Sequence, residues 1–165
     1  MVIAGSWHDQ ENGIYFNIAT AYDGFGTELA RHRKIFRYFD NKSGKAEGVG
    51  LGKSLTLLVF DDLMVALGIC RDFCERIDPN PNPFAGLDAD LFLIPSMGNK
   101  TTMKGHMETA REIALKYRAS AFVAQQSESN HPVGYLIFPG QDLDKPSSDF
   151  EVDTDWTACK VDSAL

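Results

Sequence analysis

Residues 64–73 read Met64-Val65-Ala66-Leu67-Gly68-Ile69-Cys70-Arg71-Asp72-Phe73, and they predict a short buried strand that ends at a cysteine. Five of the first six residues are apolar, and the acidic pair Asp61-Asp62 precedes them. A strand would fix the position of the thiol, and the turn that follows could aim backbone N–H groups at whatever the sulfur attacks. Cys70 is therefore a candidate nucleophile, although a buried apolar thiol fits the same pattern.

The chain around this segment is rich in short apolar runs separated by turn residues. Residues 55–60 and 64–69 predict one hairpin, and residues 14–22 and 27–34 predict another, with Lys34 near its end. We expect the other elements as follows: strands at 2–7, 89–94, 119–124, 133–138 and 156–161, a turn at 8–13, a loop at 40–53, an acidic irregular segment at 142–155, and a helix at 103–118. Many strands with few helices predict an α/β (α+β) fold, either α+β or a layered α/β sandwich.

Length and charge exclude several classes of protein. With 165 residues, the chain predicts a single domain over 1–165. A net charge of −7 disfavours nucleic acid and anionic membrane surfaces as partners, and no apolar run is long enough to span a bilayer. Three cysteines, an odd number, and no recognisable signal peptide favour a reducing compartment, so we expect a cytoplasmic location.

Other motifs offer little chemistry. The stretch 48–54 approaches a phosphate-binding loop, but Glu47 stands where the motif needs glycine, and a strand instead of a helix is expected to follow. No Cys or His stands at metal-ligand spacing near Cys70 and Cys74, so no metal or cofactor is predicted and Cys74 is taken as a structural thiol. The four histidines are expected at the surface or in satisfied structural positions: His8 in a turn, His32 in a strand, His106 on the helix and His131 in a loop.

A series of segments in one order resembles the nitrilase (carbon-nitrogen hydrolase) superfamily. The segments are Gly5-Ser6, Tyr15-Phe16-Asn17, Asp23-Gly24, Lys34, Gly68-Ile69-Cys70-Arg71-Asp72, Ala89 to Ser96, and Ala110-Arg111-Glu112-Ile113-Ala114. The resemblance implies an α-β-β-α sandwich with a Glu-Lys-Cys triad that hydrolyses amides, nitriles or carbamoyl groups through a thioester. It implies Cys70 as the nucleophile, and Lys34 with the backbone N–H of Arg71 as oxyanion stabilisers. Glu47 resembles the family's second glutamate, which positions the lysine and the attacking water.

One expected part of the family's pattern is absent from this sequence. The general-base glutamate of the family precedes the lysine by several tens of residues, after a first strand and helix, and this sequence starts beyond that point. Glu11 and Glu28 fall in a predicted turn and strand, so neither is a substitute. Because general acid–base catalysis contributes about 10²- to 10⁴-fold, we expect the chain alone to be a weak enzyme.

Three functions remain open from the sequence. The first is an amidohydrolase that acts on a small amide or nitrile. The second is a non-catalytic nitrilase-like binding or regulatory module, and the third is a thiol hydrolase of another fold with a histidine near Cys70. Loss of an opening strand and helix would expose a sheet edge, so we expect a homodimer or a larger homo-oligomer.

Overall fold

The computed structural model describes residues 1–75, 84, 87–98, 100–125 and 134–140, together with the backbone of two short strands at 151–153 and 156–158. One antiparallel sheet contains β1 (Val2–Glu11), β2 (Ile14–Tyr22) and β3 (Glu28–Arg33). A second sheet has the order β10-β9-β8-β7-β6. Its strands are β6 (Thr56–Val59), β7 (Met64–Leu67), β8 (Leu91–Ser96), β9 (Ser120–Gln125) and β10 (Gly134–Ile137).

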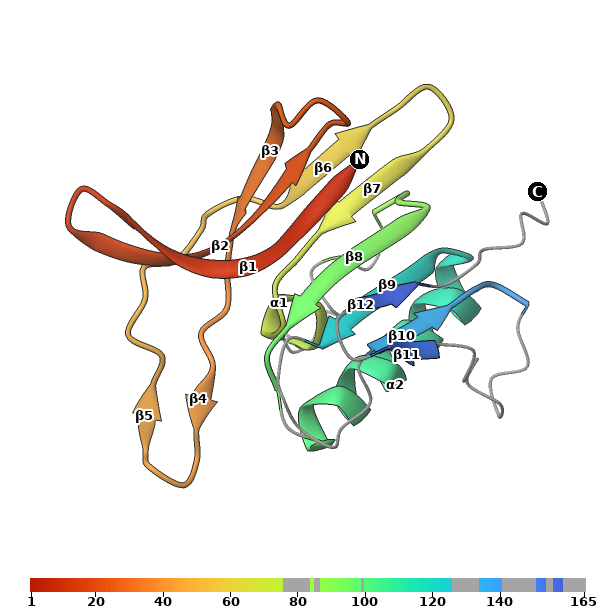
Figure 1. Ribbon diagram of the computed structural model, residues 1–165. Coiled ribbons are helices and arrows are strands. Elements are labelled where there is room, and N and C mark those ends of the chain that lie inside the picture. The colour runs from red at the N-terminus through yellow and green to blue at the C-terminus, as the bar shows by residue number, and fades with distance from the viewer. Residues whose placement is uncertain are drawn as a thin grey trace.

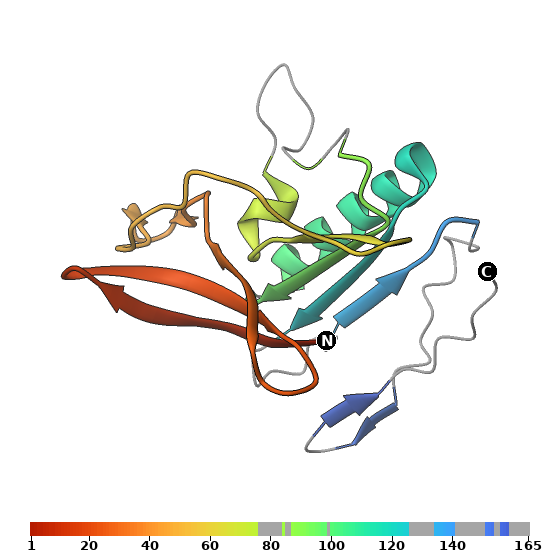
Figure 2. The same ribbon diagram turned by 90° about the horizontal axis from the view of Figure 1, so that it is seen from above.

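The two sheets and the long helix form successive layers. Helix α2 (Lys100–Tyr117) covers one face of the five-stranded sheet, and the three-stranded sheet packs against the other face (Figures 1 and 2). Strands β7, β8 and β9 are parallel, whereas β6 and β10 are antiparallel additions at the edges. This α-β-β arrangement confirms the predicted layered sandwich, with three of its four layers in the described residues.

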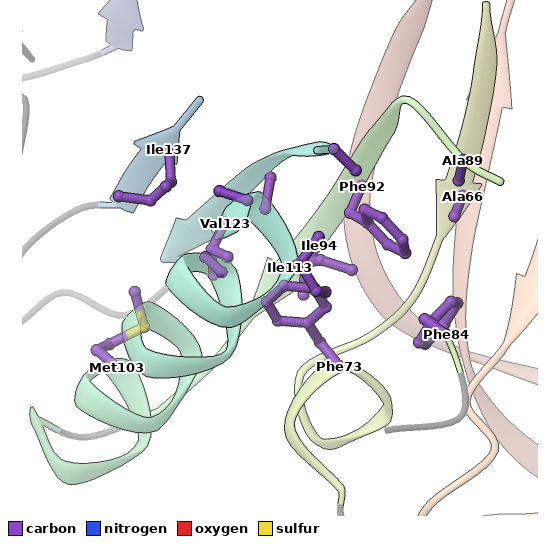
Figure 3. Close-up of a cluster of buried hydrophobic side chains, with 14 residues drawn as sticks. Ala66, Phe73, Phe84, Ala89, Phe92, Ile94, Met103, Ile113, Val123 and Ile137 are labelled. Atoms are coloured by element: carbon purple, nitrogen blue, oxygen red, sulfur yellow. The ribbon is translucent and has the colours of Figure 1, made fainter. Parts of the chain in front are cut away.

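Strand β7 is buried on both faces. The side chains of Ala66 and Phe92 lie in the cluster beneath α2, which Figure 3 shows with Phe73 and Phe84. The ring of Phe92 packs on Phe73 at 6.0 Å and edge-on against Phe84 at 5.8 Å between centroids. Val65 and Leu67 point the other way, into the layer between the sheets. A strand covered on both faces needs apolar residues at every position, which explains the continuous apolar run before Cys70.

The first hairpin differs from the expectation. Residues 8–11 belong to β1, and the turn is confined to Asn12 and Gly13, whose φ angles are 51° and 80°. Two residues with positive φ fit a two-residue hairpin loop whose twist matches the flanking strands, and Asn-Gly is the favoured pair for it. The prediction of a turn over 8–13 was therefore wrong for residues 8–11, which lie within β1.

Two other segments predicted to be irregular contain short strands. The 40–53 loop carries part of a small hairpin, β4 (Phe39–Asp40) with β5 (Lys45–Ala46), which projects away from both sheets (Figure 1). Within 142–155, β11 (Glu151–Asp153) pairs with β12 (Trp156–Ala158), the described part of the predicted closing strand. The remaining strands and the helix lie close to their predicted ranges.

A buried histidine on α2 makes stability depend on pH. His106 is fully buried, and its Nε2 lies 2.9 Å from the Ser96 hydroxyl. Burial lowers the pKa of His106 from 6.5 to about 4. Between these two values the unfolded chain binds a proton that the folded chain excludes, so stability should fall as the pH drops through this window.

We expect this histidine to cost about 2 kcal/mol of stability between pH 7 and pH 5. Urea denaturation at both pH values, on the natural chain and on His106→Gln, measures the difference. The variant should lose the part of the pH dependence that comes from the imidazole. An unchanged slope would contradict the assignment.

Candidate active site

Lys34 lies just beyond β3, at a position fixed by backbone hydrogen bonds on both sides. Its N–H donates to the carbonyl of Asn17 at 2.9 Å, which extends the ladder between β2 and β3. Its own carbonyl accepts a bond from the Gly52 N–H at 2.8 Å. The side chain is only 3% exposed, and its Nζ lies 2.5 Å from Oε2 of Glu47. The ammonium is thus buried in an ion pair.

Glu47 is held by several donors in addition to Lys34. Its Oε2 accepts a bond from the Tyr38 N–H at 3.2 Å, and its Oε1 accepts one from Nδ2 of Asn17 at 3.4 Å. Partial burial opposes ionisation of this carboxyl, but the hydrogen bond and charge of Lys34, followed by the two other donors, hold its pKa below the ordinary value. Glu47 is therefore a carboxylate at neutral pH and faces an ammonium.

The glycine-rich stretch 48–54 runs close against β2 and the end of β3. Gly50 bridges to Phe16 of β2, and a Cβ on Gly50 would lie 2.6 Å from the Phe16 ring. A Cβ on Gly52 would lie 2.2 Å from the carbonyl oxygen of Arg33, while Gly48 has open space. The segment can run this close to β2 and β3 only without side chains at these two positions. The glycines thus serve close packing beside Lys34.

Cys70 follows β7 in a strained turn. Its N–H donates to the carbonyl of Pro95 at 3.0 Å, and its backbone has φ 48° and ψ −105°. A positive φ at a residue other than glycine costs about 1–3 kcal/mol and persists only where surrounding contacts enforce it. The residue is 8% exposed. This turn connects β7 to the short helix α1 (Arg71–Cys74).

One buried carboxylate ties the cysteine turn to the lysine segment. Oδ2 of Asp72 accepts the Ile69 N–H at 3.0 Å and lies 2.9 Å from Nε2 of His32. Its Oδ1 accepts the N–H groups of Ile35 at 2.9 Å and Phe36 at 2.8 Å. Asp72 thus contacts the residue before the cysteine and the two residues after the lysine. No periodicity or spacing in the sequence predicted a role for this side chain.

Three of the four predicted site residues line one cavity. Cys70, Lys34 and Glu47 share a pocket of about 640 Å³. Other groups that line it include His8, Asn17 and Tyr38. Arg71, the fourth, begins α1, and its side chain hydrogen-bonds Glu75 outside the pocket. Only the backbone N–H of Arg71 was implicated by the resemblance, and that amide directly follows the cysteine.

Comparisons by sequence and by structure give similar proteins of the same kind. No family model matches the chain. Over 112 residues the sequence is 29% identical to omega-amidase NIT2 of Danio rerio. This match covers 65% of this chain and 40% of that protein. The structure matches Saccharomyces cerevisiae Nit3, a member of branch 10 of the nitrilase superfamily, with a TM-score of 0.63 and 16% identity. That match covers 83% of this chain and 51% of Nit3. The chain has the nitrilase-superfamily fold.

A third comparison concerns a glutamate variant of the amidase from Nesterenkonia sp. AN1. Its TM-score is 0.58 at 20% identity, over 81% of this chain and 52% of the amidase. In that structure the acetamide moiety of fluoroacetamide is attached covalently to the active-site cysteine. The resemblance predicted from the sequence is thus confirmed, and the nitrilase-like chain spans about half of the length of these relatives or less.

The histidines of this nitrilase-like chain were partly mispredicted. His32 and His106 are fully buried and hydrogen-bonded, as expected of structural residues. His8 lies in β1 and lines the pocket, which corrects the expectation of a turn. His131 lies outside the described residues. The pairing of β1 with β2 was the missing information, because it aligns His8 with Asn17.

The second cysteine differs from Cys70. Cys74 ends α1 and does not line the pocket. Burial, followed by the nearby Cys70, raises the pKa of the Cys74 thiol to about 11, so the thiol stays protonated at neutral pH.

Two other features are absent from the described part of the chain. It holds no group of three His, Cys, Asp or Glu that could bind a metal ion, and none of its helices has the length and apolar character of a membrane span.

Proposed function

We propose that this chain hydrolyses the carbon–nitrogen bond of small amides through a thioester on Cys70. The observation that carries the proposal is the shared pocket, in which a thiol, a buried ammonium and a paired carboxylate meet. Attack on an amide carbon requires a thiol, a cation that stabilises the negative charge developing on the carbonyl oxygen, and a restrained geometry. The non-catalytic alternative has no comparable observation in its favour.

The residues would have distinct roles in this reaction. Sγ of Cys70 attacks the amide carbon, and negative charge develops on the carbonyl oxygen. The ammonium of Lys34 and the backbone N–H of Arg71 stabilise that charge. The carbon–nitrogen bond then breaks, the amine leaves with a proton, and water hydrolyses the thioester to regenerate the thiol. Glu47 holds the ammonium of Lys34 in position through the 2.5 Å contact.

The volume of the pocket and the names of similar proteins both support a small substrate. A volume of about 640 Å³ lies within the range of small-molecule sites. Two of the proteins that the chain resembles are named an omega-amidase and an amidase, which favours an amide over a nitrile or carbamoyl group. Self-association, a cytoplasmic location and a single domain over 1–165 stay predictions from the sequence.

Covalent labelling tests the proposal. The 165-residue chain is incubated with fluoroacetamide, and the modified cysteine is mapped by mass spectrometry of peptides. We expect modification of Cys70, because it lines the pocket, and none of Cys74, whose protonated thiol serves as the internal control. In parallel, ammonia release is measured with a panel of primary amides.

The Cys70→Ala variant should release no ammonia, whereas Cys74→Ala should retain the activity of the natural chain. Equal labelling of Cys70 and Cys74 without ammonia release would contradict the proposed function. Ammonia release that persists in Cys70→Ala would contradict it as well.

A further inference from the structure

The proposed reaction needs a group that moves protons, and most ionisable groups of the pocket are already engaged. A base must take the thiol proton, and an acid must protonate the departing nitrogen. Glu47 is paired with Lys34. Asp40 accepts N–H bonds from Lys42 and Ser43, and bonds from Ser43 and Lys42 lower its pKa. Neither carboxylate is therefore well placed to carry a proton at neutral pH.

The acids preceding Lys34 do not fill this role either. Glu11 forms an ion pair with Arg33 at 2.6 Å, and Glu28 forms one with Arg31 at 2.9 Å. Neither glutamate lines the pocket. Among the described residues, the other groups that line the pocket are therefore the candidates for a proton carrier.

His8 lies where such a group is needed. It stands directly opposite Asn17 in the β1–β2 ladder, and side chains opposite each other in a ladder lie on one face at about 5 Å between Cβ atoms. Asn17 reaches Glu47 with its amide, and Nε2 of His8 lies 3.9 Å from Oε1 of the same carboxylate. The imidazole is 59% exposed, so it can exchange protons with solvent, and it lines the same cavity as Cys70.

We propose that His8 is the proton-transferring catalytic residue of this site. The inference rests on the proposed amide hydrolysis and adds a proton carrier that the other described residues of the pocket do not supply. Histidine suits the role because its ordinary pKa, about 6.5, lets it both accept and donate a proton near neutral pH.

The proton balance closes with His8 alone. Neutral His8 takes the Cys70 thiol proton by way of water in the cavity, and the thiolate forms the carbon–sulfur bond. The resulting imidazolium gives that proton to the nitrogen as the carbon–nitrogen bond breaks. Neutral His8 then takes a proton from the water that attacks the thioester, and returns it to sulfur as the carbon–sulfur bond breaks. The net change is amide plus water to acid plus amine.

Several other ionisable groups share the cavity with the imidazole of His8. The ionisable groups that line the cavity with His8 are Lys34, Tyr38, Asp40, Lys45, Glu47 and Cys70. The pH profile of the reaction therefore reports the whole cluster, and the His8 contribution is isolated by substitution.

The test compares two substrates that differ in the leaving group. His8→Gln should lower kcat/KM for a primary amide by about 100-fold, because the amine must be protonated as it leaves. For a p-nitrophenyl ester, whose leaving group needs no proton, the loss should be about tenfold smaller. The acid limb of the amide profile should also move to higher pH, because the thiol must then ionise without a base. Asp9→Asn is the matched control, since Asp9 neighbours His8 in β1 but pairs with Arg31 outside the cavity.

A second measurement does not require turnover. Alkylation of Cys70 by iodoacetamide at about pH 7 should slow about tenfold in His8→Gln, and the rates of the two chains should converge at high pH, where the thiol ionises unaided. Amide hydrolysis and alkylation within about twofold of the natural chain in His8→Gln, with hydrolysis lost in Cys70→Ala, would overturn the role of His8 alone. A natural chain that neither hydrolyses amides nor reacts selectively at Cys70 would overturn both proposals.

Discussion

Lys34→Met is expected to lower kcat/KM for amide hydrolysis by about 10²- to 10³-fold, the usual loss when one donor to a developing oxyanion is removed. The substitution keeps the length and apolar stem of a side chain that is 3% exposed, so the pocket should keep its shape. What disappears is the positive charge 2.5 Å from Glu47. Ammonia release from a primary amide measures the effect, with Lys53→Met, an exposed lysine outside the pocket, as the matched control.

A double substitution separates the roles of Lys34 and Glu47. If Glu47 acts only by holding the ammonium, Lys34→Met combined with Glu47→Gln should be no slower than Lys34→Met alone. Losses that multiply would mean that the carboxylate also acts on substrate or water. A Lys34→Met chain within about threefold of the natural rate would contradict the assignment of Lys34 as an oxyanion stabiliser.

The layered fold could be predicted because burial leaves a direct mark on sequence. The β7 segment is apolar at nearly every position since both of its faces are covered, and α2 shows apolar residues at three- and four-residue spacing. Cys70 was singled out because it stands at the end of such a patterned segment, whereas the role of Lys34 came from the resemblance to the nitrilase superfamily. Local pattern therefore predicted the strands, and the pairing of the two proposed site residues stays a prediction.

The parts that escaped prediction depend on contacts between distant segments. The polar residues of the first hairpin resemble a turn until Asn12-Gly13 is recognised as the two-residue loop, and only the resulting register brings His8 opposite Asn17. The sequence argued against a phosphate loop at 48–54, but it did not reveal that Gly50 and Gly52 approach Phe16 and Arg33 closely. No periodicity reveals such a contact, because the partners lie tens of residues away.

The buried carboxylate of Asp72 is the clearest case of a long-range contact that the pattern could not reveal. It accepts hydrogen bonds from the N–H groups of Ile35 and Phe36, 37 and 36 residues away along the chain, and also contacts His32. These bonds hold the segment after Lys34 against the turn before Cys70. The distance between the proposed nucleophile and the proposed oxyanion stabiliser therefore depends on a residue that belongs to neither role.

Asp72→Asn should lower the free energy of unfolding by about 3 kcal/mol and slow alkylation of Cys70 as well. The amide oxygen can still accept the N–H groups of Ile35 and Phe36, but the NH₂ group would face the Ile69 N–H, two donors without an acceptor between them. Urea denaturation gives the stability, and iodoacetamide labelling gives the reactivity.

Asp62→Asn is the matched control. This residue lies in the exposed turn between β6 and β7, and the same chemical change there should shift stability by less than about 0.5 kcal/mol. If the two variants unfold at the same urea concentration, Asp72 does not hold the two segments together, because a buried carboxylate with four contacts cannot lose one acceptor at no cost.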